Sequence, residues 1–173
     1  TKVVSIAHIT NVIGDVRNIK EISRVCHDRN ILLVVDAAQS IAHEKIDVQD
    51  MDIDFLAFSG HKIYGLKGIG LLYKKDNIVI TPLIHGGKST TVYRSGTPAL
   101  PLMVSMMKAM ELIIPNVDKN YEYIRKLNKK ICDKLKEYPL VHINSTENSI
   151  VHTINFSLKD VKPETFVHAL EEE

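Results

Sequence analysis

Polar residues that could carry chemistry stand at the ends of three apolar, strand-like runs of the chain. His8 and Asn11 follow the first run, Asp36 and Gln39 the second, and Lys62 the third. In parallel α/β sheets the carboxyl ends of neighbouring strands meet at one edge, where ligands bind. A lysine amine can form an imine with an aldehyde, and a carboxylate can keep a pyridinium nitrogen protonated. These residue types together are the protein groups that pyridoxal phosphate requires.

Each of these residues also has an ordinary structural explanation. Asp36 could cap a helical turn over residues 37–41, and otherwise a carboxylate at the end of an apolar strand needs a cationic partner. A single lysine in a loop such as SGHKIYG is most often solvated. The combination of acid and lysine, with Ser59 and His61 directly before the lysine, favours a binding site over either explanation taken alone.

The elements that must position these residues are typical of an open α/β fold. The runs Lys2–Ile9, Ile31–Asp36 and Asp54–Ser59 predict buried strands, and Gly68–Lys74 predicts a fourth that could return antiparallel. A helix with a capping box at Asn18 lies between the first two strands, which therefore form a right-handed βαβ unit. The predicted fold class is α/β, a predominantly parallel sheet with flanking helices.

The second half of the chain predicts longer helices and short strands. Residues 101–114 form a predicted helix that Pro115 ends, and a second helix with many basic residues follows. Strands over Leu140–Ile143 and Ile150–Ser157 then precede a helix that Pro163 begins. The basic residues are explained better by a solvated surface than by nucleic-acid binding.

Composition narrows the function classes further. The 173 residues are 45% hydrophobic and 25% charged with a net charge of +1, so neither nucleic acid nor a membrane is the expected partner. Leu100–Ile114 is interrupted by Lys108 and Glu111 and is too short to span a bilayer. Cys26 and Cys132 have no metal-site or disulfide spacing, which favours a reducing, cytoplasmic setting. The chain begins without methionine and stops inside a predicted helix, so we expect a piece of a longer protein.

Several motifs resemble one enzyme family in order and approximate spacing. They are HITNVIG (8–14), VDAAQS (35–40), SGHKIYGLKGIG (59–70), HGG (85–87) and YRSGT (93–97). The chain resembles the cysteine desulfurase group of class V aminotransferases, which are fold-type I pyridoxal-phosphate enzymes, and the block around the lysine is the most specific match. The resemblance implies that residues 1–114 are the C-terminal part of a large cofactor-binding domain. Residues 115–173 would then begin a small α+β domain.

The resemblance also implies roles for the residues around the cofactor ring. Lys62 would bind pyridoxal 5'-phosphate as an imine and later move protons at the substrate. Asp36 would pair with the pyridinium nitrogen, and Gln39 would hydrogen-bond the ring hydroxyl. Asn11 would lie near that hydroxyl and the substrate carboxylate.

Other matched positions concern the phosphate group. Ser59 and His61 would hold the phosphate, and Thr97 would reach the phosphate of the neighbouring subunit in a homodimer. The loop after HGG departs from the family, because Lys88–Thr91 stand where a further Gly and a His or Gln with Glu are typical. This departure leaves the choice of substrate open.

The activity that the resemblance implies is conversion of L-cysteine to L-alanine, with the sulfur passed on as a persulfide. A sulfur-acceptor protein and a role in iron–sulfur cluster assembly would follow. The sulfur-accepting cysteine is expected beyond residue 173, since Cys26 and Cys132 are interpreted as structural, so this piece alone would be inactive. Another class V activity, such as a selenocysteine lyase or an aminotransferase, stays open, as does a non-catalytic folded piece that self-associates. The histidines show no metal-ligand spacing.

Overall fold

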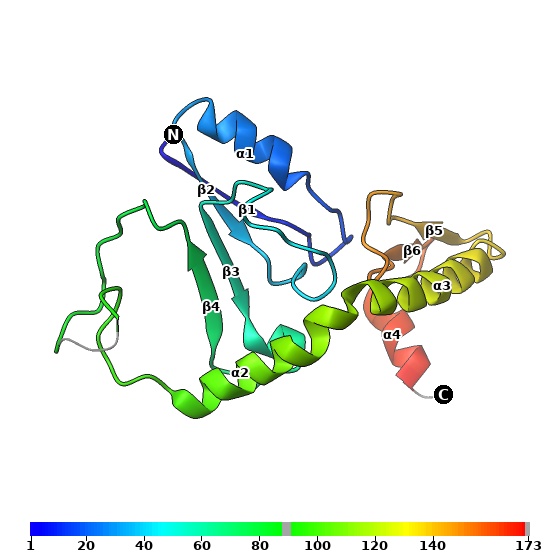
Figure 1. Ribbon diagram of the computed structural model, residues 1–173. Helices are drawn as coiled ribbons and strands as arrows, with labels where there is room; N and C mark the ends of the chain where they lie inside the picture. The colour runs from blue at the N-terminus through cyan, green and yellow to red at the C-terminus, as the bar shows by residue number, and fades with distance from the viewer. Residues whose placement is uncertain (88–90, 172–173) are drawn as a thin grey trace.

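An open, mostly parallel sheet organises the first half of the computed structural model, which describes residues 1–87 and 91–171 (Figure 1). The strands are β1 (Val3–Ala7), β2 (Leu32–Asp36), β3 (Phe55–Ser59) and β4 (Gly70–Lys74), in that spatial order. β1, β2 and β3 pair in parallel, and β4 returns antiparallel to β3. The predicted α/β class and the four predicted strands are confirmed.

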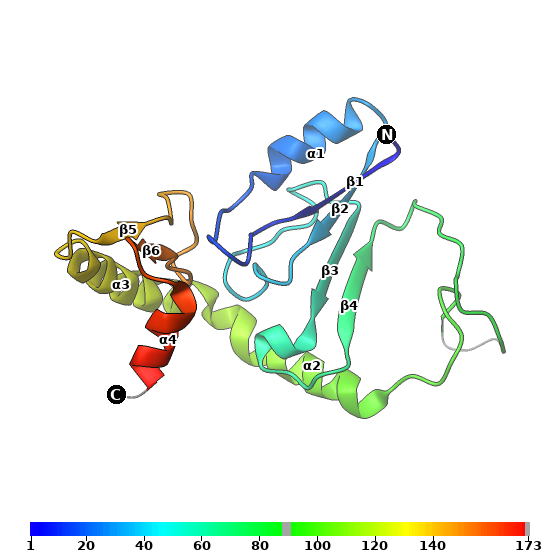
Figure 2. The same ribbon diagram turned by 180° about the vertical axis from the view of Figure 1, so that it is seen from behind.

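The crossover between β1 and β2 is the helix α1 (Ile19–His27), as predicted. The side-chain oxygen of Asn18 accepts a hydrogen bond from the backbone N–H of Glu21 at 3.2 Å, which is the expected cap of the first turn. Ile19 and Cys26 on one face of α1 are buried in the core. The helix therefore lies on the sheet along the apolar stripe that its sequence predicts (Figures 1 and 2).

The core fixes the carboxyl end of β3 and the turn that follows it. Leu33 and Val35 of β2 and Leu56 of β3 are buried, and so is Ile63 in the short 3-10 helix η1 (Gly60–Ile63). Burying an aliphatic side chain of this size contributes about 1.5–3 kcal/mol. The turn that carries Lys62 is thus anchored from beneath by Ile63.

A long helical stretch follows the loop after β4. It consists of α2 (Leu100–Ile113), η2 (Ile114–Asn116) and α3 (Val117–Leu135). Pro115 ends α2 close to the predicted position but does not separate the two helices, because a proline is tolerated in the turn before a helix, where a backbone N–H needs no helical partner. The division of the chain at residue 114 stays a prediction.

By length and composition alone, the stretch Leu100–Leu135 could cross a membrane, since its most apolar 18-residue window has a mean hydropathy of 1.3 and is 11% buried. The expectation of no span considered Leu100–Ile114 alone and did not anticipate the continuation into α3. Met106 and Ala109, within α2, pack into the core with the sheet residues. One side of α2 therefore packs against the core of the first half of the chain.

The end of the described chain forms a second, smaller sheet. Strand β5 (Val141–Ile143) pairs antiparallel with β6 (Phe156–Leu158), and α4 (Pro163–Glu171) follows. The strand predicted over Ile150–Ser157 is wrong for residues 150–155, which form turns and irregular backbone. The physical reason is a competing contact, because the N–H of Ile150 donates to the carbonyl of Gly14 at 2.8 Å instead of pairing within this sheet.

A compact group of charges ties the amino end of β3 to α1 and to the end of β4. Asp54, whose side chain is 5% exposed, accepts hydrogen bonds from His27 Nε2, from Lys75 Nζ and from the backbone N–H of Leu33, each at 2.8 Å. Asp52 contacts the same histidine and lysine. Hydrogen bonds to Asp54 raise the pKa of His27 against the opposing effect of burial, and the two cations lower the pKa of Asp52.

This group predicts a stability that depends on pH through His27. Its folded pKa is raised above the ordinary value of 6.5, so its contribution is complete below that value and is lost as the pH rises through the folded pKa. We expect His27→Gln to destabilise the protein by about 2 kcal/mol near pH 6 and by less near pH 9. Urea unfolding at both pH values measures this, with His142→Gln as the exposed control. A difference that grows with pH would contradict the assignment.

Candidate functional site

The register of the sheet brings the predicted residues to one edge. Ala7 lies opposite Asp36 in the pairing of β1 with β2, and Asp36 lies opposite Ala57 in the pairing of β2 with β3. The N–H of His8 donates to the carbonyl of Asp36 at 2.9 Å, and Ser59 lies two residues beyond Ala57. The carboxyl ends of the three strands therefore lie side by side, as the sequence predicts.

Asp36 ends β2 as an exposed carboxylate with a local backbone partner. Its Oδ1 accepts a hydrogen bond from the N–H of Ala38 at 2.8 Å, and the N–H groups of Ser40 and Ile41 donate to the carbonyl of Ala37. The capping explanation thus describes its local contact. The expected cationic partner is not found among the described residues, because the carboxylate is solvated and needs no such partner. Its Oδ2 has no hydrogen-bond partner among the described residues and can accept one from a ligand.

Lys62 stands on a tightly closed turn. The N–H of Gly65 donates to the carbonyl of Gly60 at 3.0 Å, and Tyr64 closes η1 in the left-handed region with a φ of 65°. The side chains of His61 and Lys62 are exposed, whereas Ile63 between them and Tyr64 is buried. A turn anchored in this way presents the two cationic side chains at a fixed place.

Several predicted side chains at this edge have no partner within the described part of the chain. No hydrogen bond or ion pair between described residues engages the side chains of Asn11, Gln39, Ser59, His61 or Lys62. Asn11, His61 and Lys62 are exposed and Gln39 and Ser59 half-buried, so water can satisfy these side chains until another group displaces it. These donors and acceptors are therefore accessible to a ligand at the same edge as Asp36.

His8, which the sequence places at the end of the first strand without assigning it a role, adds a buried polar atom to this edge. Its side chain is 5% exposed, and its Nδ1 has no hydrogen-bond partner among the described residues. Burial lowers its pKa, so the ring is neutral near pH 7. The signal in the sequence was a histidine directly after an apolar strand. An unsatisfied buried nitrogen at the same edge supports a site that a further group completes.

Thr97 is not brought together with the other predicted residues. It is exposed and lies between β4 and α2, where the described residues 75–87 and 91–99 extend away from the sheet in both views (Figures 1 and 2). The base of this segment is held by the N–H of Ser95, which donates to the carbonyl of Ile84 at 3.1 Å. Of the positions where the loop departs from the resembling family, Lys88, Ser89 and Thr90 lie outside the described residues.

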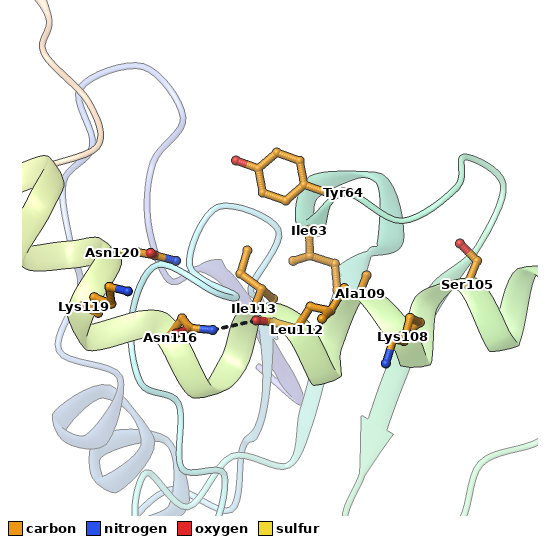
Figure 3. A pocket seen from close by; sticks show the side chains of 10 residues that line it. All are labelled: Ile63, Tyr64, Ser105, Lys108, Ala109, Leu112, Ile113, Asn116, Lys119 and Asn120. Atoms are coloured by element: carbon orange, nitrogen blue, oxygen red, sulfur yellow. Dashed lines mark hydrogen bonds between the residues drawn. The ribbon is translucent and has the colours of Figure 1, made fainter.

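A hollow of about 700 Å³ lies between η1 and α2, directly after Lys62 (Figure 3). Ile63 and Leu112 form part of its apolar wall, Tyr64 stands at its rim, and Lys108 and Lys119 add positive charge. None of the predicted site residues lines it. The hollow is therefore distinct from the group of predicted site residues at the carboxyl edge of the sheet.

The fold and the edge residues together define a class of protein: an open α/β protein with acid, lysine and amide side chains gathered at the carboxyl ends of parallel strands. Within that class, the chain belongs to the class V aminotransferases, because the model of that family matches residues 1–173. The resemblance read from the motifs is thereby confirmed.

Named relatives of this family align along nearly the whole chain. The cysteine desulfurase IscS of Buchnera aphidicola is 38% identical in an alignment of 173 positions that covers 98% of this chain and 43% of that protein. A mitosomal cysteine desulfurase of Encephalitozoon cuniculi is also 38% identical, over 99% of this chain and 40% of its own length. The chain thus spans less than half the length of these relatives.

Solved structures of related proteins share the fold. A NifS-like protein superposes with a TM-score of 0.93 at 29% identity, over 99% of this chain and 48% of that chain. The cysteine desulfurase CsdA of Escherichia coli superposes with a TM-score of 0.87 at 26% identity, over 99% of this chain and 47% of its own. The mostly parallel sheet with flanking helices is therefore the fold of roughly half of a NifS-like protein.

Proposed function

We propose that the protein to which this chain contributes is a pyridoxal-phosphate-dependent cysteine desulfurase. In this reaction the sulfur of L-cysteine is transferred to a cysteine thiol of the enzyme as a persulfide, and L-alanine is released. The observation that carries the proposal is the placement of Asp36 and the Lys62 turn at neighbouring strand ends. Relatives named cysteine desulfurase over this same stretch support it.

The residues at the ring side of the site fit the cofactor. Pyridoxal phosphate, when bound, withdraws electrons from the substrate Cα through its protonated ring. Asp36 would keep the ring nitrogen protonated through its free oxygen, and Lys62 would hold the cofactor and move the proton at the substrate Cα. Gln39 would donate to the ring hydroxyl, and Asn11 would orient the substrate carboxylate. The free side chains and the unsatisfied Nδ1 of His8 support this fit.

The phosphate side of the site uses residues of the turn after β3. Ser59 and His61 have exposed or partly exposed side chains without partners among the described residues, and both can donate to an anion. Thr97 would contribute its hydroxyl to the phosphate of a partner subunit, which agrees with its place in a segment that extends away from its own sheet. A homodimer would then contain two cofactor sites, each formed by residues of both subunits.

The surface around α2 supports self-association. Leu100, Met103 and Met107 of α2 are between 49% and 64% exposed, and Tyr64 of the neighbouring turn is 89% exposed. Exposed apolar patches of this kind mark contacts with another chain or with a further part of the same protein. We assign this surface, including the hollow in Figure 3, to contact with the partner subunit.

The cellular setting follows from the same proposal. Cys26 is buried and Cys132 half-buried, and neither forms a disulfide, which suits the reducing cytoplasm. We propose that a second protein accepts the persulfide sulfur and that iron–sulfur cluster assembly consumes it. The thiol that carries the persulfide would lie outside this chain, because Cys26 packs in the core and the thiol of Cys132 donates to Asn128 at 3.5 Å.

The full-length protein tests the proposed reaction directly. We expect it to bind pyridoxal phosphate and to release sulfide and alanine in equal amounts from L-cysteine in the presence of a thiol reductant. Amino-group transfer to an oxo acid without sulfide release would identify an aminotransferase, and strict preference for selenocysteine would identify a lyase. Self-association without any cofactor band would identify a non-catalytic folded protein and refute the desulfurase.

A further inference from the structure

The loop that carries Asn11 is joined to a distant part of the chain. The N–H of Val16 donates to the carbonyl of Asn148 at 3.1 Å, and the N–H of Ile150 donates to the carbonyl of Gly14 at 2.8 Å. These two bonds flank the antiparallel bridge between Asp15 and Ser149. Residues more than 130 positions apart in sequence are therefore held against each other next to the predicted site.

The loop is closed at its base and open at its tip. Within it, the N–H of Gly14 donates to the carbonyl of Thr10 at 3.2 Å, and the N–H of Asp15 donates to the Thr10 hydroxyl at 2.9 Å. Gly14 has a φ of +75°, and a Cβ there would lie 2.9 Å from the Cβ of Thr153. Asn11 and Val12 form the exposed tip. Hydrogen bonds thus hold residues 10, 14 and 15 at the base of the loop, whereas Asn11 and Val12 at its tip must be held by a separate contact.

Asn155 supplies that contact. Its Nδ2 donates to the carbonyl of Val12 at 3.1 Å, directly beside Asn11. The amide is held in this orientation because its Oδ1 accepts from Asn144 Nδ2 at 2.6 Å, and its own backbone N–H donates to the Ser145 hydroxyl at 2.8 Å. Asn155 is therefore a donor whose orientation is fixed by its hydrogen bonds with Asn144 and Ser145.

We propose that Asn155 is a positioning residue that sets the place of Asn11 through the carbonyl of Val12. Asn155 does not touch the proposed cofactor itself. The contact couples the irregular segment 148–155, which follows β5, to the carboxyl edge of the four-stranded sheet. The part of this inference that concerns the cofactor rests on the proposed function, whereas the coupling of the loop to Asn155 does not.

The substitution Asn155→Asp tests this role selectively. The aspartate keeps an acceptor oxygen for Asn144 but loses the donor to Val12 and places a negative charge near that carbonyl. We expect amide hydrogen exchange at Gly14 and Asp15 to accelerate about threefold to tenfold, as loss of one hydrogen bond predicts. Exchange at Leu33, whose N–H donates to Asp54, serves as the internal reference and is expected to stay unchanged.

A matched control removes a neighbouring bond of the same network. Ser157→Ala deletes the hydroxyl that accepts from Asn144 at 2.9 Å but leaves the contact of Asn155 with Val12. We expect this variant to exchange as the unsubstituted protein does. If Asn155→Asp fails to fold, Asn155→Ser replaces it, because serine is too short to reach Val12 and carries no charge.

A second readout separates positioning from plain stability. In the full-length protein loaded with pyridoxal phosphate, we expect Asn155→Asp to shift the pH midpoint of the visible cofactor band, and Ser157→Ala to leave it in place. Unchanged loop exchange, or changed exchange with an unmoved midpoint, overturns the positioning role. If the unsubstituted protein shows no cofactor band, the proposed function fails, and the loop exchange alone decides the coupling.

Discussion

Replacing Lys62 by alanine will remove the visible absorption band of the full-length protein incubated with pyridoxal phosphate, and borohydride will no longer fix the cofactor to the chain. The rate of sulfide release from L-cysteine will fall by at least about a thousandfold, since the residue both holds the cofactor and moves a proton. The fold should survive, because the Lys62 side chain is exposed and makes no described contact, whereas the buried Ile63 anchors the turn.

A neighbouring lysine provides the matched control for this experiment. Lys67 lies in the same loop, is also exposed, and follows the turn rather than the strand. Lys67→Ala should keep the band, the borohydride reaction and the rate within about twofold, as expected for a solvated surface residue. If Lys62→Ala retains a borohydride-sensitive band, another amine binds the cofactor, and the role assigned to Lys62 is wrong.

The four-stranded sheet could be predicted from local sequence because each strand corresponds to a short run rich in apolar residues. A buried parallel strand must be apolar along its length, and runs such as ILLVVD satisfy this without reference to the rest of the chain. The cap at Asn18 is equally local, since donor and acceptor lie three residues apart. The convergence of the strand ends then follows from parallel pairing alone, so the sequence is enough to place Asp36 and the Lys62 turn at one edge of the sheet.

Several features that the sequence did not predict depend on long-range contacts. Ile150 has the composition of a strand residue, but its N–H bonds to Gly14, so the predicted strand begins only at Phe156. His43 and His152 stack with their ring centroids 4.2 Å apart, although their sequence positions give no sign of a pair. Burial, together with the neighbouring His43, lowers the pKa of His152 to about 4, so the His152 ring is neutral near pH 7. Local pattern cannot reveal which segments meet.

Lys75 shows that ion pairs, too, cannot be predicted from the local sequence. Its position after β4 suggests a solvated lysine, yet its Nζ contacts both Asp52 and Asp54, and its side chain is 24% exposed. The pairing depends on the antiparallel return of β4, which places residue 75 beside the amino end of β3. Once the topology is known, the ion pairs follow, and they identify Asp54 as the residue on which this end of the sheet depends.

Replacing Asp54 by alanine will therefore destabilise the protein strongly, by about 3 kcal/mol in the free energy of unfolding. The substitution leaves the buried N–H of Leu33 in β2 without its acceptor, and it removes a carboxylate from His27 and Lys75. The loss should lie toward the lower end for a buried ion pair, because Asp52 still contacts both cations. Urea unfolding followed by circular dichroism measures it.

Two further variants separate the causes of this loss. Asp50→Ala deletes an exposed carboxylate that pairs with Lys20 at 2.6 Å, and it should cost less than about 1 kcal/mol, as surface ion pairs do. Asp54→Asn keeps an oxygen for the N–H of Leu33 but removes the charge, so it should fall between the other two. A loss for Asp54→Ala no larger than that for Asp50→Ala would mean that the charge group at the amino end of β3 is solvated, and that core packing alone holds this end of the sheet.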